Sequence, residues 1–326
     1  MSISENKSEK DVCLEVKNLK VYFSTSKGIL RAVDDVSFNV FSEEILGIVG
    51  ESGCGKTMTA LSIMRLIPYP GWIYGGKIFF HRQNLLELTE DQMRLIRGKK
   101  IGMVLQDPFS SLNPIYTTGN QLSEVLGKGL GRNDRKEKIV NALKQVSILN
   151  PEDRFYSYPF ELSGGMNQRC VIAMALLPNP ELIIADEPTT SLDVTIQMQV
   201  LNLLKELQGK NRSSIIIITH DFGVVAAVCT RVLVMYSGKI VENASKDRIL
   251  RNPCHPYTKS LLASIPKLGD SKKKLHTIPG QPGEFFDSTQ RCLFANRCDQ
   301  ALPICGEETP PFIEIEETHW VSCWRT

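Results

Sequence analysis

Continuous apolar runs and helically spaced apolar positions alternate through much of the chain, a pattern typical of an α/β fold with a buried parallel sheet. Runs rich in isoleucine, leucine and valine predict buried strands at residues 44–49, 100–106, 181–186 and 214–219. Helical spacing predicts helices at residues 58–66, 89–97 and 194–207, the second with Thr89 as its N-cap. A strand at residues 231–235 and a hairpin strand at 238–242 complete this predicted core.

Three other stretches depart from that alternation. Alternating apolar residues predict an antiparallel patch near the N-terminus, with strands at residues 13–16, 19–23, 29–40 and 75–80. Strand character almost disappears at residues 119–175, where helical periodicity predicts an insertion with helices at 121–126, 136–146 and 165–177. Beyond residue 251 prolines become frequent. We therefore expect a core at residues 1–251, with a helical subdomain at about 107–175, and an extension at 252–326.

Composition adds few constraints to this picture. The chain has 326 residues, a formal net charge of +2 and 42% hydrophobic residues, which gives it little electrostatic drive toward nucleic acid. No apolar run reaches the length of a membrane-spanning helix, and residues 1–10 are polar rather than signal-like. We expect a cytosolic protein that reaches a membrane surface only through a partner. Disulfides are improbable in that compartment despite nine cysteines.

The strongest motif is an octapeptide between the first predicted buried strand and the helix that follows it. Residues 50–57 read Gly-Glu-Ser-Gly-Cys-Gly-Lys-Thr and fit the P-loop pattern G-x-x-x-x-G-K-[ST]. Glycines allow the backbone amides to wrap an anion, while the lysine adds a point charge and the threonine a magnesium ligand. An ordinary glycine-rich turn would not explain Lys-Thr directly after Gly55. The predicted phosphate-binding residues are Gly50, Ser52, Gly53, Cys54, Gly55, Lys56, Thr57 and Met58.

Two further segments carry chemistry that suits the P-loop. The strand at residues 182–186 delivers Asp186 and then Glu187 at its carboxyl end, the edge at which α/β sheets bind ligands. Asp186 suits the magnesium shell, and Glu187 is placed to polarise a water. Ser163-Gly164-Gly165 opens a predicted helix, whose free amides form a second anion site; alone, it reads equally well as a helix N-cap.

These segments occur in a distinctive order along the chain. The P-loop, Gln106, the run 163–166, Asp186-Glu187, the run 191–193 and His220-Asp221 follow one another as they do in an ATP-binding cassette ATPase. Residues from about 14 to 242 therefore resemble the nucleotide-binding domain of ABC transporters. The resemblance implies an α/β P-loop NTPase core of RecA-like type, with an antiparallel β subdomain, a helical subdomain and, in this chain, a small cysteine-rich C-terminal extension.

The resemblance also implies a role for each matched residue. Lys56 binds the β- and γ-phosphates of ATP, and Thr57, Gln106 and Asp186 bind Mg²⁺. Glu187 is the general base, and His220 holds the γ-phosphate and positions the water, so that the catalytic residues are Glu187, His220 and Gln106. Ser163, Gly164 and Gly165 serve the nucleotide of an opposite subunit. Phe23 lies where an aromatic ring stacks on adenine, with Tyr22 as the neighbouring candidate. Two departures from the family pattern, Cys54 and Met166, remove no charge and no required glycine.

Four cysteines near the C-terminus need a separate explanation. Cys292, Cys298, Cys305 and Cys323 have the spacing C-x5-C-x6-C-x17-C. Zinc sites usually use tighter C-x-x-C pairs, whereas an iron–sulfur cluster tolerates wider loops and is held by four thiolates. Spacing alone leaves iron–sulfur and zinc equally open. His319 is a loop histidine that could replace Cys323 at a metal.

Two C-terminal segments narrow that choice by resemblance. Residues 255–262 and 291–298 are similar to the C-terminal region of oligopeptide/dipeptide importer ATPases, in which this cysteine pattern carries a [4Fe–4S] cluster. The one departure, Asn296 in place of a proline, affects no ligand. The resemblance implies a structural cluster that packs the tail, with zinc as the alternative.

The expected protein is an ATP-hydrolysing subunit that energises uptake of dipeptides or oligopeptides at the cytoplasmic face of the membrane. Its implied partners are a second ATPase subunit, identical or related, two permease subunits and, indirectly, an extracytoplasmic peptide-binding protein. Nickel, glutathione or another small solute is the alternative cargo. The rival class is a soluble ABC ATPase acting on nucleic acid or ribosomes. Such proteins usually have two cassettes, long coiled-coil insertions or a basic surface, none of which the sequence contains.

Overall fold

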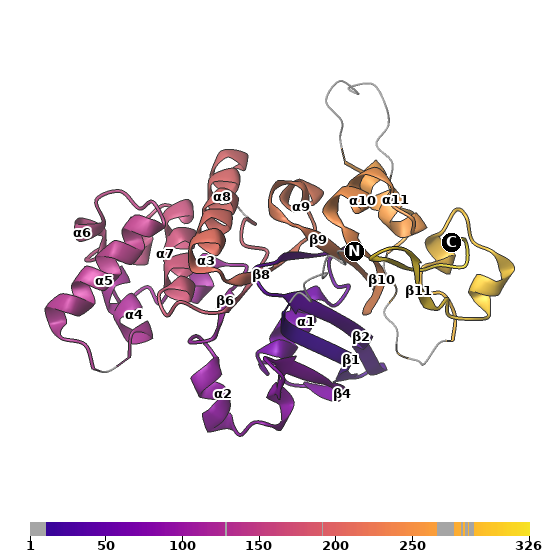
Figure 1. The fold of residues 1–326 in the computed structure, drawn as a ribbon, viewed down its shortest axis with the longest axis horizontal. Coiled ribbons are helices and arrows are strands. Elements are labelled where there is room, and N and C mark those ends of the chain that lie inside the picture. Colours follow the sequence, from indigo (N-terminus) through magenta and orange to yellow (C-terminus); the bar gives the residue numbers. More distant parts are fainter. Residues whose placement is uncertain are drawn as a thin grey trace, which may run out of the picture.

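The computed structural model describes residues 11–326 except 128, 191, 266–276, 282, 284–285 and 287–289. In this part of the chain the main sheet has eight strands in the order β11-β12-β10-β9-β3-β8-β7-β6 (Figure 1). The parallel strands are β9 (Arg231–Tyr236), β3 (Ile45–Val49), β8 (Ser214–Thr219), β7 (Leu182–Asp186) and β6 (Ile101–Val104). The antiparallel strands at one edge are β10 (Lys239–Ser245), β12 (His319–Ser322) and β11 (Phe312–Glu316).

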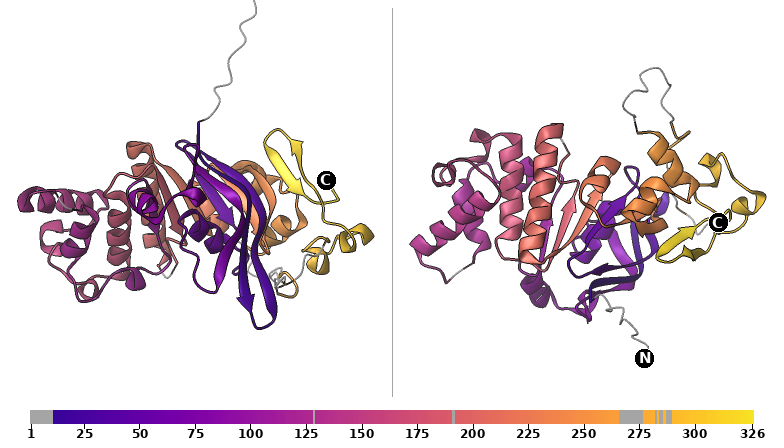
Figure 2. Two further views of the ribbon diagram at one scale, coloured as in Figure 1. Left: turned by 90° about the horizontal axis from the view of Figure 1, so that it is seen from below. Right: turned by 45° about the horizontal axis from the view of Figure 1, so that its top comes forward.

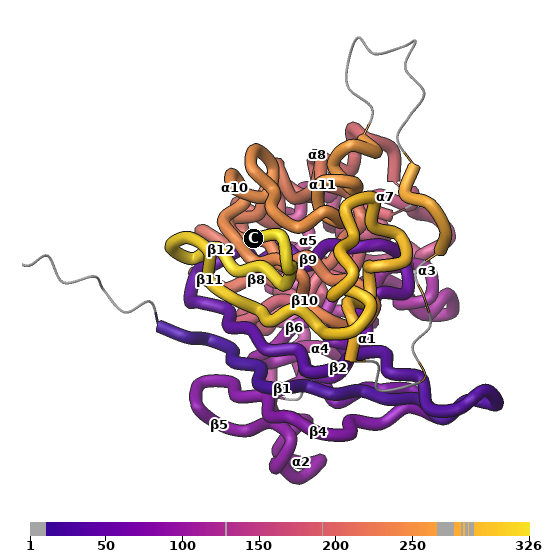
Figure 3. The backbone as a smooth tube through the Cα atoms, turned by 90° about the vertical axis from the view of Figure 1, so that its right-hand side faces the viewer, coloured from indigo at the N-terminus to yellow at the C-terminus, as the bar shows by residue number. Residues whose placement is uncertain are grey.

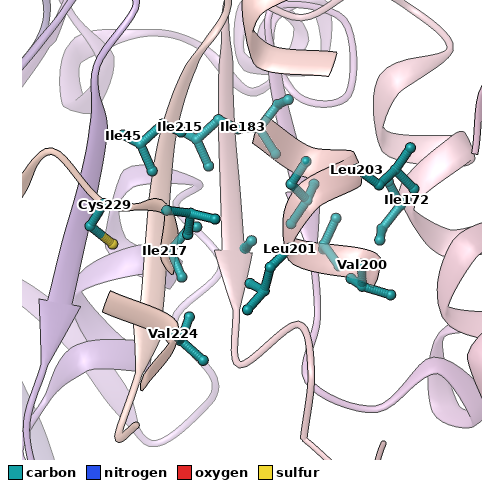
Figure 4. Close-up of a cluster of buried hydrophobic side chains, with 14 of the residues drawn as sticks. Ile45, Ile172, Ile183, Val200, Leu201, Leu203, Ile215, Ile217, Val224 and Cys229 are labelled. Carbon is teal, nitrogen blue, oxygen red and sulfur yellow. The ribbon is translucent and has the colours of Figure 1, made fainter. Parts of the chain in front are cut away.

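The parallel strands are apolar on both faces because each face is covered. In β8, Ile215 and Ile217 belong to one buried cluster, and Ile216 and Ile218 belong to the other. The first cluster packs against three helices, α7 (Gly164–Leu176), α8 (Val194–Asn211) and α9 (Phe222–Val228). Figure 4 shows Val200, Leu201 and Leu203 beside the isoleucines of the sheet. Successive residues of each strand thus point into two different buried clusters, which explains why the sequence of these strands is an unbroken apolar run.

The second cluster lies between the main sheet, helix α1 (Lys56–Ile63) and an antiparallel sheet. That sheet has the order β2-β1-β4-β5, and its strands are β1 (Val12–Thr25), β2 (Gly28–Phe41), β4 (Gly71–Phe80) and β5 (Gln83–Asn84). The two N-terminal strands predicted from sequence are one strand, β1, whose pairing with β2 has register shifts. A 3₁₀ turn, η1 (Leu85–Glu87), and helix α2 (Glu90–Ile96) follow; Thr89 caps α2 in a capping box with Gln92.

The predicted helical region forms one end of the molecule in Figure 1. Its elements are α3 (Pro108–Ser111), α4 (Thr118–Val125), α5 (Arg132–Gln145), α6 (Pro151–Arg154) and the 3₁₀ turn η2 (Pro159–Glu161). Helix α7 connects this region to the core because it packs against α3, α4, α5 and β6. The short helices α3 and α6 are too brief for periodicity to reveal them.

The chain beyond β10 returns to the core at the opposite end of the molecule, as Figures 2 and 3 show. It contains α10 (Lys246–Arg251), α11 (Pro256–Ala263), η3 (Ala295–Arg297) and η4 (Pro303–Gly306) before the β11–β12 hairpin. Strand β12 pairs with β10 through Glu242↔Val321 and Asn243↔Trp320. The final residues of the chain therefore continue the core sheet. No sequence pattern predicts strands β11 and β12.

Within the described residues no helix combines the length and the apolar character that crossing a membrane requires.

Candidate functional site

The P-loop lies between the buried end of β3 and the start of α1. Two of its glycines are required by close contacts: a Cβ at Gly50 would lie 2.2 Å from the carbonyl oxygen of Met235, and one at Gly55 would lie 2.4 Å from that of Ala32. Gly55 caps α1 with φ of 103°, and Gly53 has φ of 79°, both in the region that favours glycine. The loop can therefore follow this path only with glycine at these positions.

Lys56 is buried and bonded to the loop that it belongs to. Its Nζ atom donates to the carbonyl oxygens of Gly50, at 2.8 Å, and Glu51, at 2.9 Å, and lies 3.7 Å from the Sγ atom of Cys54. The ammonium is thus held over the loop by weak neutral acceptors. Phosphate oxygens are stronger acceptors for it because charge-assisted bonds are about twice as strong as neutral ones.

The three residues predicted to be catalytic lie together. Glu187 follows β7, and its Oε2 atom accepts from Nε2 of Gln106 at 3.0 Å and from Oγ1 of Thr190 at 2.8 Å. Its Oε1 atom lies 3.0 Å from Nδ1 of His220, which follows β8. Glu187 also has φ of 46°, unusual for a residue other than glycine. The ends of three neighbouring strands therefore converge on one carboxylate.

Hydrogen bonds keep the Glu187 carboxylate ionised. Burial would raise the pKa of Glu187, but hydrogen bonds from His220 and Thr190 and the charges of His220 and Lys56 outweigh it, so that this pKa lies below its usual value. An ionised carboxylate that points toward Gln106 and His220 can accept a proton from a water held beside it.

Asp186 has the geometry of a metal-binding acid. Burial raises the pKa of its carboxyl, and a hydrogen bond from Thr57 opposes that rise. Its Oδ1 atom is buried and has no hydrogen-bond partner. A buried oxygen without a partner is costly unless another group binds it. Asp186 and Thr57 are both hard oxygen ligands, so this pair fits Mg²⁺.

The Ser163 segment begins helix α7. The Oγ atom of Ser163 accepts from the amide of Met166 at 3.3 Å, which makes Ser163 the N-cap. A Cβ at Gly165 would lie 2.8 Å from Cγ2 of Ile196, whereas a Cβ at Gly164 would meet nothing within 4 Å. Gly165 therefore serves packing against α8, and Gly164 leaves an open approach to the helix amides. Asp193 caps α8 in the same region; Ser191 lies outside the described residues.

The two aromatic candidates for adenine binding differ in availability. Tyr22 is 5% exposed, donates from its hydroxyl to Oδ1 of Asp34 at 2.9 Å and stacks on Tyr74 with centroids 4.7 Å apart. Phe23 is partly exposed and packs against Gly71, where a Cβ would lie 2.5 Å from the ring. Phe23 is the better placed of the two candidates, because both the ring and the hydroxyl of Tyr22 already have partners in the protein; Tyr22 stays the second candidate.

Comparison with known proteins places this constellation in a family. The family model described as "ABC transporter" matches residues 33–190, and the one described as "Oligopeptide/dipeptide transporter, C-terminal region" matches residues 241–305. A probable peptide ABC transporter ATP-binding protein of Sinorhizobium fredii is 46% identical, over 97% of this chain and 96% of its own length. The oligopeptide transport ATP-binding protein OppD of Bacillus subtilis is 48% identical, over 95% of this chain and 88% of its own.

The chain belongs to the ATP-binding proteins of the oligopeptide/dipeptide ABC transporter family. Among solved structures, the dimeric ATP-binding cassette MJ0796, in a post-hydrolysis state bound to ADP and Pi, is similar with a TM-score of 0.65 and 26% identity. That match covers 72% of this chain and 98% of the cassette. The similarity to this cassette thus covers the ATPase core, and the second family model covers much of the chain that follows the core.

In this ABC ATPase the four C-terminal cysteines lie in neighbouring turns. The amide of Cys292 donates to the carbonyl oxygen of Cys305 at 3.0 Å, and the charge of each of Cys298, Cys305 and Cys323 affects the pKa of Cys292. Each of the four sulfurs accepts a hydrogen bond from a backbone amide; the donors belong to Phe294, Gln300, Leu302 and Arg325. Backbone N–H donors of this kind surround cluster sulfurs in iron–sulfur proteins.

A different group contains the most closely packed metal-binding atoms among the described residues. The ligand atoms of Glu242, Cys254 and His319 all lie within 4.8 Å of one another. His319 is 2% exposed rather than a loop histidine, and its Nε2 atom lies 2.8 Å from Oε1 of Glu242. Glu242 is fully buried and also accepts from the amides of Cys254, at 2.7 Å, and His255, at 3.1 Å. These bonds satisfy the carboxylate, so the group is explained as the attachment of the final hairpin to β10.

A second long-range attachment, between the extension and the P-loop, is not predictable from the sequence. Arg297 of the extension forms a two-pronged ion pair with Glu51 of the P-loop, with N–O distances of 2.7 and 2.9 Å. Tyr257 accepts from the amide of Glu51 at 2.9 Å. No local sequence pattern connects Arg297 with a residue 246 positions away. His255 caps α11, and burial lowers its pKa to about 4.

Proposed function

We propose that this chain hydrolyses ATP to power the import of short peptides by a membrane ABC transporter. The observation that carries the proposal is the Glu187 carboxylate held between Gln106 and His220 at the strand ends beside the P-loop. The names of the relatives, which include peptide, oligopeptide and dipeptide transport, support the cargo. Location at the cytoplasmic face of the membrane follows from the need to meet both ATP and the permease.

The residues divide the work of phosphoryl transfer. The P-loop amides and Lys56 bind the β- and γ-phosphates, and Phe23 stacks on adenine. Thr57, Asp186 and Gln106 would hold Mg²⁺, which supplies charge neutralisation on the phosphate oxygens when bound. Glu187 accepts the proton of the attacking water, and His220 orients that water toward the γ-phosphate. Phosphoryl transfer needs positioned charges and an oriented water rather than a protein nucleophile, and this residue set provides both.

A second ATPase subunit completes the site. Gly164 leaves the α7 amides open toward the outside of this chain, which supports a role for Ser163, Gly164 and Gly165 at the nucleotide of a partner subunit. The dimeric state of the similar cassette agrees with this arrangement. Two permease subunits and a peptide-binding protein outside the cell complete the proposed transporter. Because the peptide need not touch this chain, its identity is a property of those partners.

We also propose a [4Fe–4S] cluster at Cys292, Cys298, Cys305 and Cys323. The four thiols are close enough to affect one another and each has a backbone N–H donor, which supports a shared metal centre. A single zinc ion requires thiolate sulfurs about 3.8 Å apart, given Zn–S bonds of about 2.3 Å. Among the described residues the group of three ligand atoms that lie within 4.8 Å of one another is Glu242, Cys254 and His319, so the four cysteine sulfurs do not meet even this wider limit. A cluster, which needs wider spacing, therefore suits these cysteines better than zinc does.

The proposed function is tested by reconstitution. The purified chain, with its co-purifying permease and ATPase partners, is placed in lipid vesicles, and uptake of labelled di- and oligopeptides is measured with and without MgATP. We expect uptake that requires MgATP and is lost with Lys56→Ala. Accumulation of nickel or glutathione without peptide uptake would correct the cargo, and an ATPase that stays soluble and is stimulated by nucleic acid would overturn the transporter assignment.

A further inference from the structure

The P-loop is joined to the C-terminal extension at its second residue, Glu51. All three polar parts of Glu51 are engaged. Its amide donates to Oη of Tyr257, and its carbonyl oxygen accepts from Nζ of Lys56. Its carboxylate accepts hydrogen bonds from both terminal nitrogens of the Arg297 guanidinium. Two of these three partners lie beyond residue 251. The segment that begins the phosphate cradle is therefore fixed from outside the cassette core.

The Arg297 guanidinium is itself held in one orientation. Its Nε atom donates to the carbonyl oxygen of Pro279 at 2.8 Å, and it lies over the ring of Tyr236, 5.7 Å from the centroid. The Arg297 side chain is 7% exposed and that of Glu51 is 25% exposed. A planar guanidinium can bind one carboxylate through two nitrogens at once, and a lysine cannot reproduce this bidentate geometry. Its burial and its other partners mark it as an ordered contact rather than a surface ion pair.

We propose that Arg297 is a positioning residue for ATP binding, acting through Glu51. Arg297 cancels the Glu51 charge beside a site that must accept the strongly negative triphosphate. It also fixes the loop so that the Glu51 carbonyl keeps its place beside Lys56. The inference rests on the proposed ATPase function and adds to it a residue outside the cassette that sets nucleotide affinity. Because Gln106, Glu187 and His220 do not contact Arg297 or Glu51, the effect falls on binding rather than on the chemical step.

An experiment can distinguish the proposed role of Arg297 in ATP binding from a purely structural role in holding the extension. The extension has its own attachment, in which β12 pairs with β10 and Glu242 binds His319. Loss of Arg297 alone therefore leaves the tail in place. If charge compensation is what matters, removing the Glu51 charge as well must recover part of the affinity. If Arg297 only fastens the tail, Glu51→Gln cannot recover it.

The test compares variants of the full chain in the purified transporter, with MgATP as the probe. We expect Arg297→Met to raise the Kd and KM for MgATP about tenfold and to change kcat by less than about twofold. Adding Glu51→Gln to Arg297→Met lowers the Kd again by about threefold or more. The matched control is Arg291→Met, which alters the exposed arginine before Cys292 and leaves the Kd unchanged.

Two results overturn the inference: equal Kd values for Arg297→Met and Arg291→Met, or a Kd that Glu51→Gln does not lower. If Arg297→Met does not fold, Arg297→Lys, which keeps the charge and loses the fork, replaces it. A smaller rise in Kd is then expected, and no rise overturns the inference. Failure of the proposed function is separate, because it appears as absent MgATP turnover in the wild-type transporter, whereas the Kd comparison needs no turnover.

Discussion

Thr190 donates its hydroxyl to the Oε2 atom of Glu187 at 2.8 Å and so stabilises the ionised form of the proposed base. The same carboxylate is approached by Gln106 and His220 from two other strand ends. The pKa of Glu187 thus depends on neighbours that can be changed singly.

Thr190→Val separates this effect from catalysis itself. The hydroxyl lowers the pKa of Glu187, so its removal raises that pKa. The base is then protonated at a higher pH as the solution is acidified. We expect the acid limb of the kcat profile to move to higher pH. Thr190→Ser keeps the hydroxyl and serves as the control, with a wild-type profile; an unmoved limb in Thr190→Val would contradict the account.

Phe23→Ala tests the adenine site. Stacking of a base on an aromatic ring is worth about 1–3 kcal/mol, so we expect the KM for ATP to rise about fivefold or more with little change in kcat. Tyr22→Phe removes the hydroxyl that donates to Asp34 and should cost stability of about 0.5–1.5 kcal/mol while leaving the KM unchanged. Steady-state kinetics and thermal unfolding separate the two outcomes. A higher KM for Tyr22→Phe would favour Tyr22 as the adenine contact.

Cys292→Ser tests the proposed cluster. Loss of one of four thiolate ligands should bleach visible absorption and reduce the iron and sulfide contents of the purified protein. Cys170→Ser, at a buried cysteine of helix α7, is the control for a thiol outside the group. Wild-type protein that carries stoichiometric zinc and no sulfide would replace the cluster by a zinc site.

Two histidine–glutamate pairs with the same 2.8 Å separation test the attachment of the final hairpin. His319 and Glu242 are 2% and 0% exposed at their side chains, whereas His81 and Glu181 are 38% and 48% exposed. Removing one partner of a buried hydrogen-bonded pair costs about 1–3 kcal/mol, and removing one of an exposed pair costs about 0–1 kcal/mol. We expect His319→Ala to lower the Tm by several degrees and to speed hydrogen exchange in β12. His81→Ala is the matched control, and equal effects would refute the anchoring role.

The parts of the fold with local signals were predictable from sequence. Unbroken isoleucine runs predicted β7 and β8 because both faces of these strands are buried, and Thr89 predicted the start of α2 through its capping box. Helix α9 was not predicted. It has seven residues and is apolar on most sides, so its sequence lacks the periodic alternation of apolar and polar residues that indicates a helix.

The contacts between the core and the extension had no such signal. Hairpin β11–β12 pairs with β10, some 77 positions away along the chain at Glu242 and His319, and the Arg297–Glu51 pair spans 246 positions. The resemblance to ABC ATPases implied the catalytic residues Gln106, Glu187 and His220 because each lies in a short motif that can be recognised locally. It could not predict which residues of the extension reach the P-loop, because tertiary packing alone brings them together.

Glu187→Gln, measured by MgATP turnover and MgATP binding in the purified transporter, tests the central claim most directly. The amide keeps the size of the side chain but cannot accept the proton, so we expect turnover to fall about 100-fold or more while ATP stays bound and the ATPase dimer stays closed. Glu181→Gln, at the exposed acid before β7, is the control at the other end of the same strand. Turnover within about twofold of wild type in Glu187→Gln, or a dimer that reopens normally after ATP addition, would contradict the account.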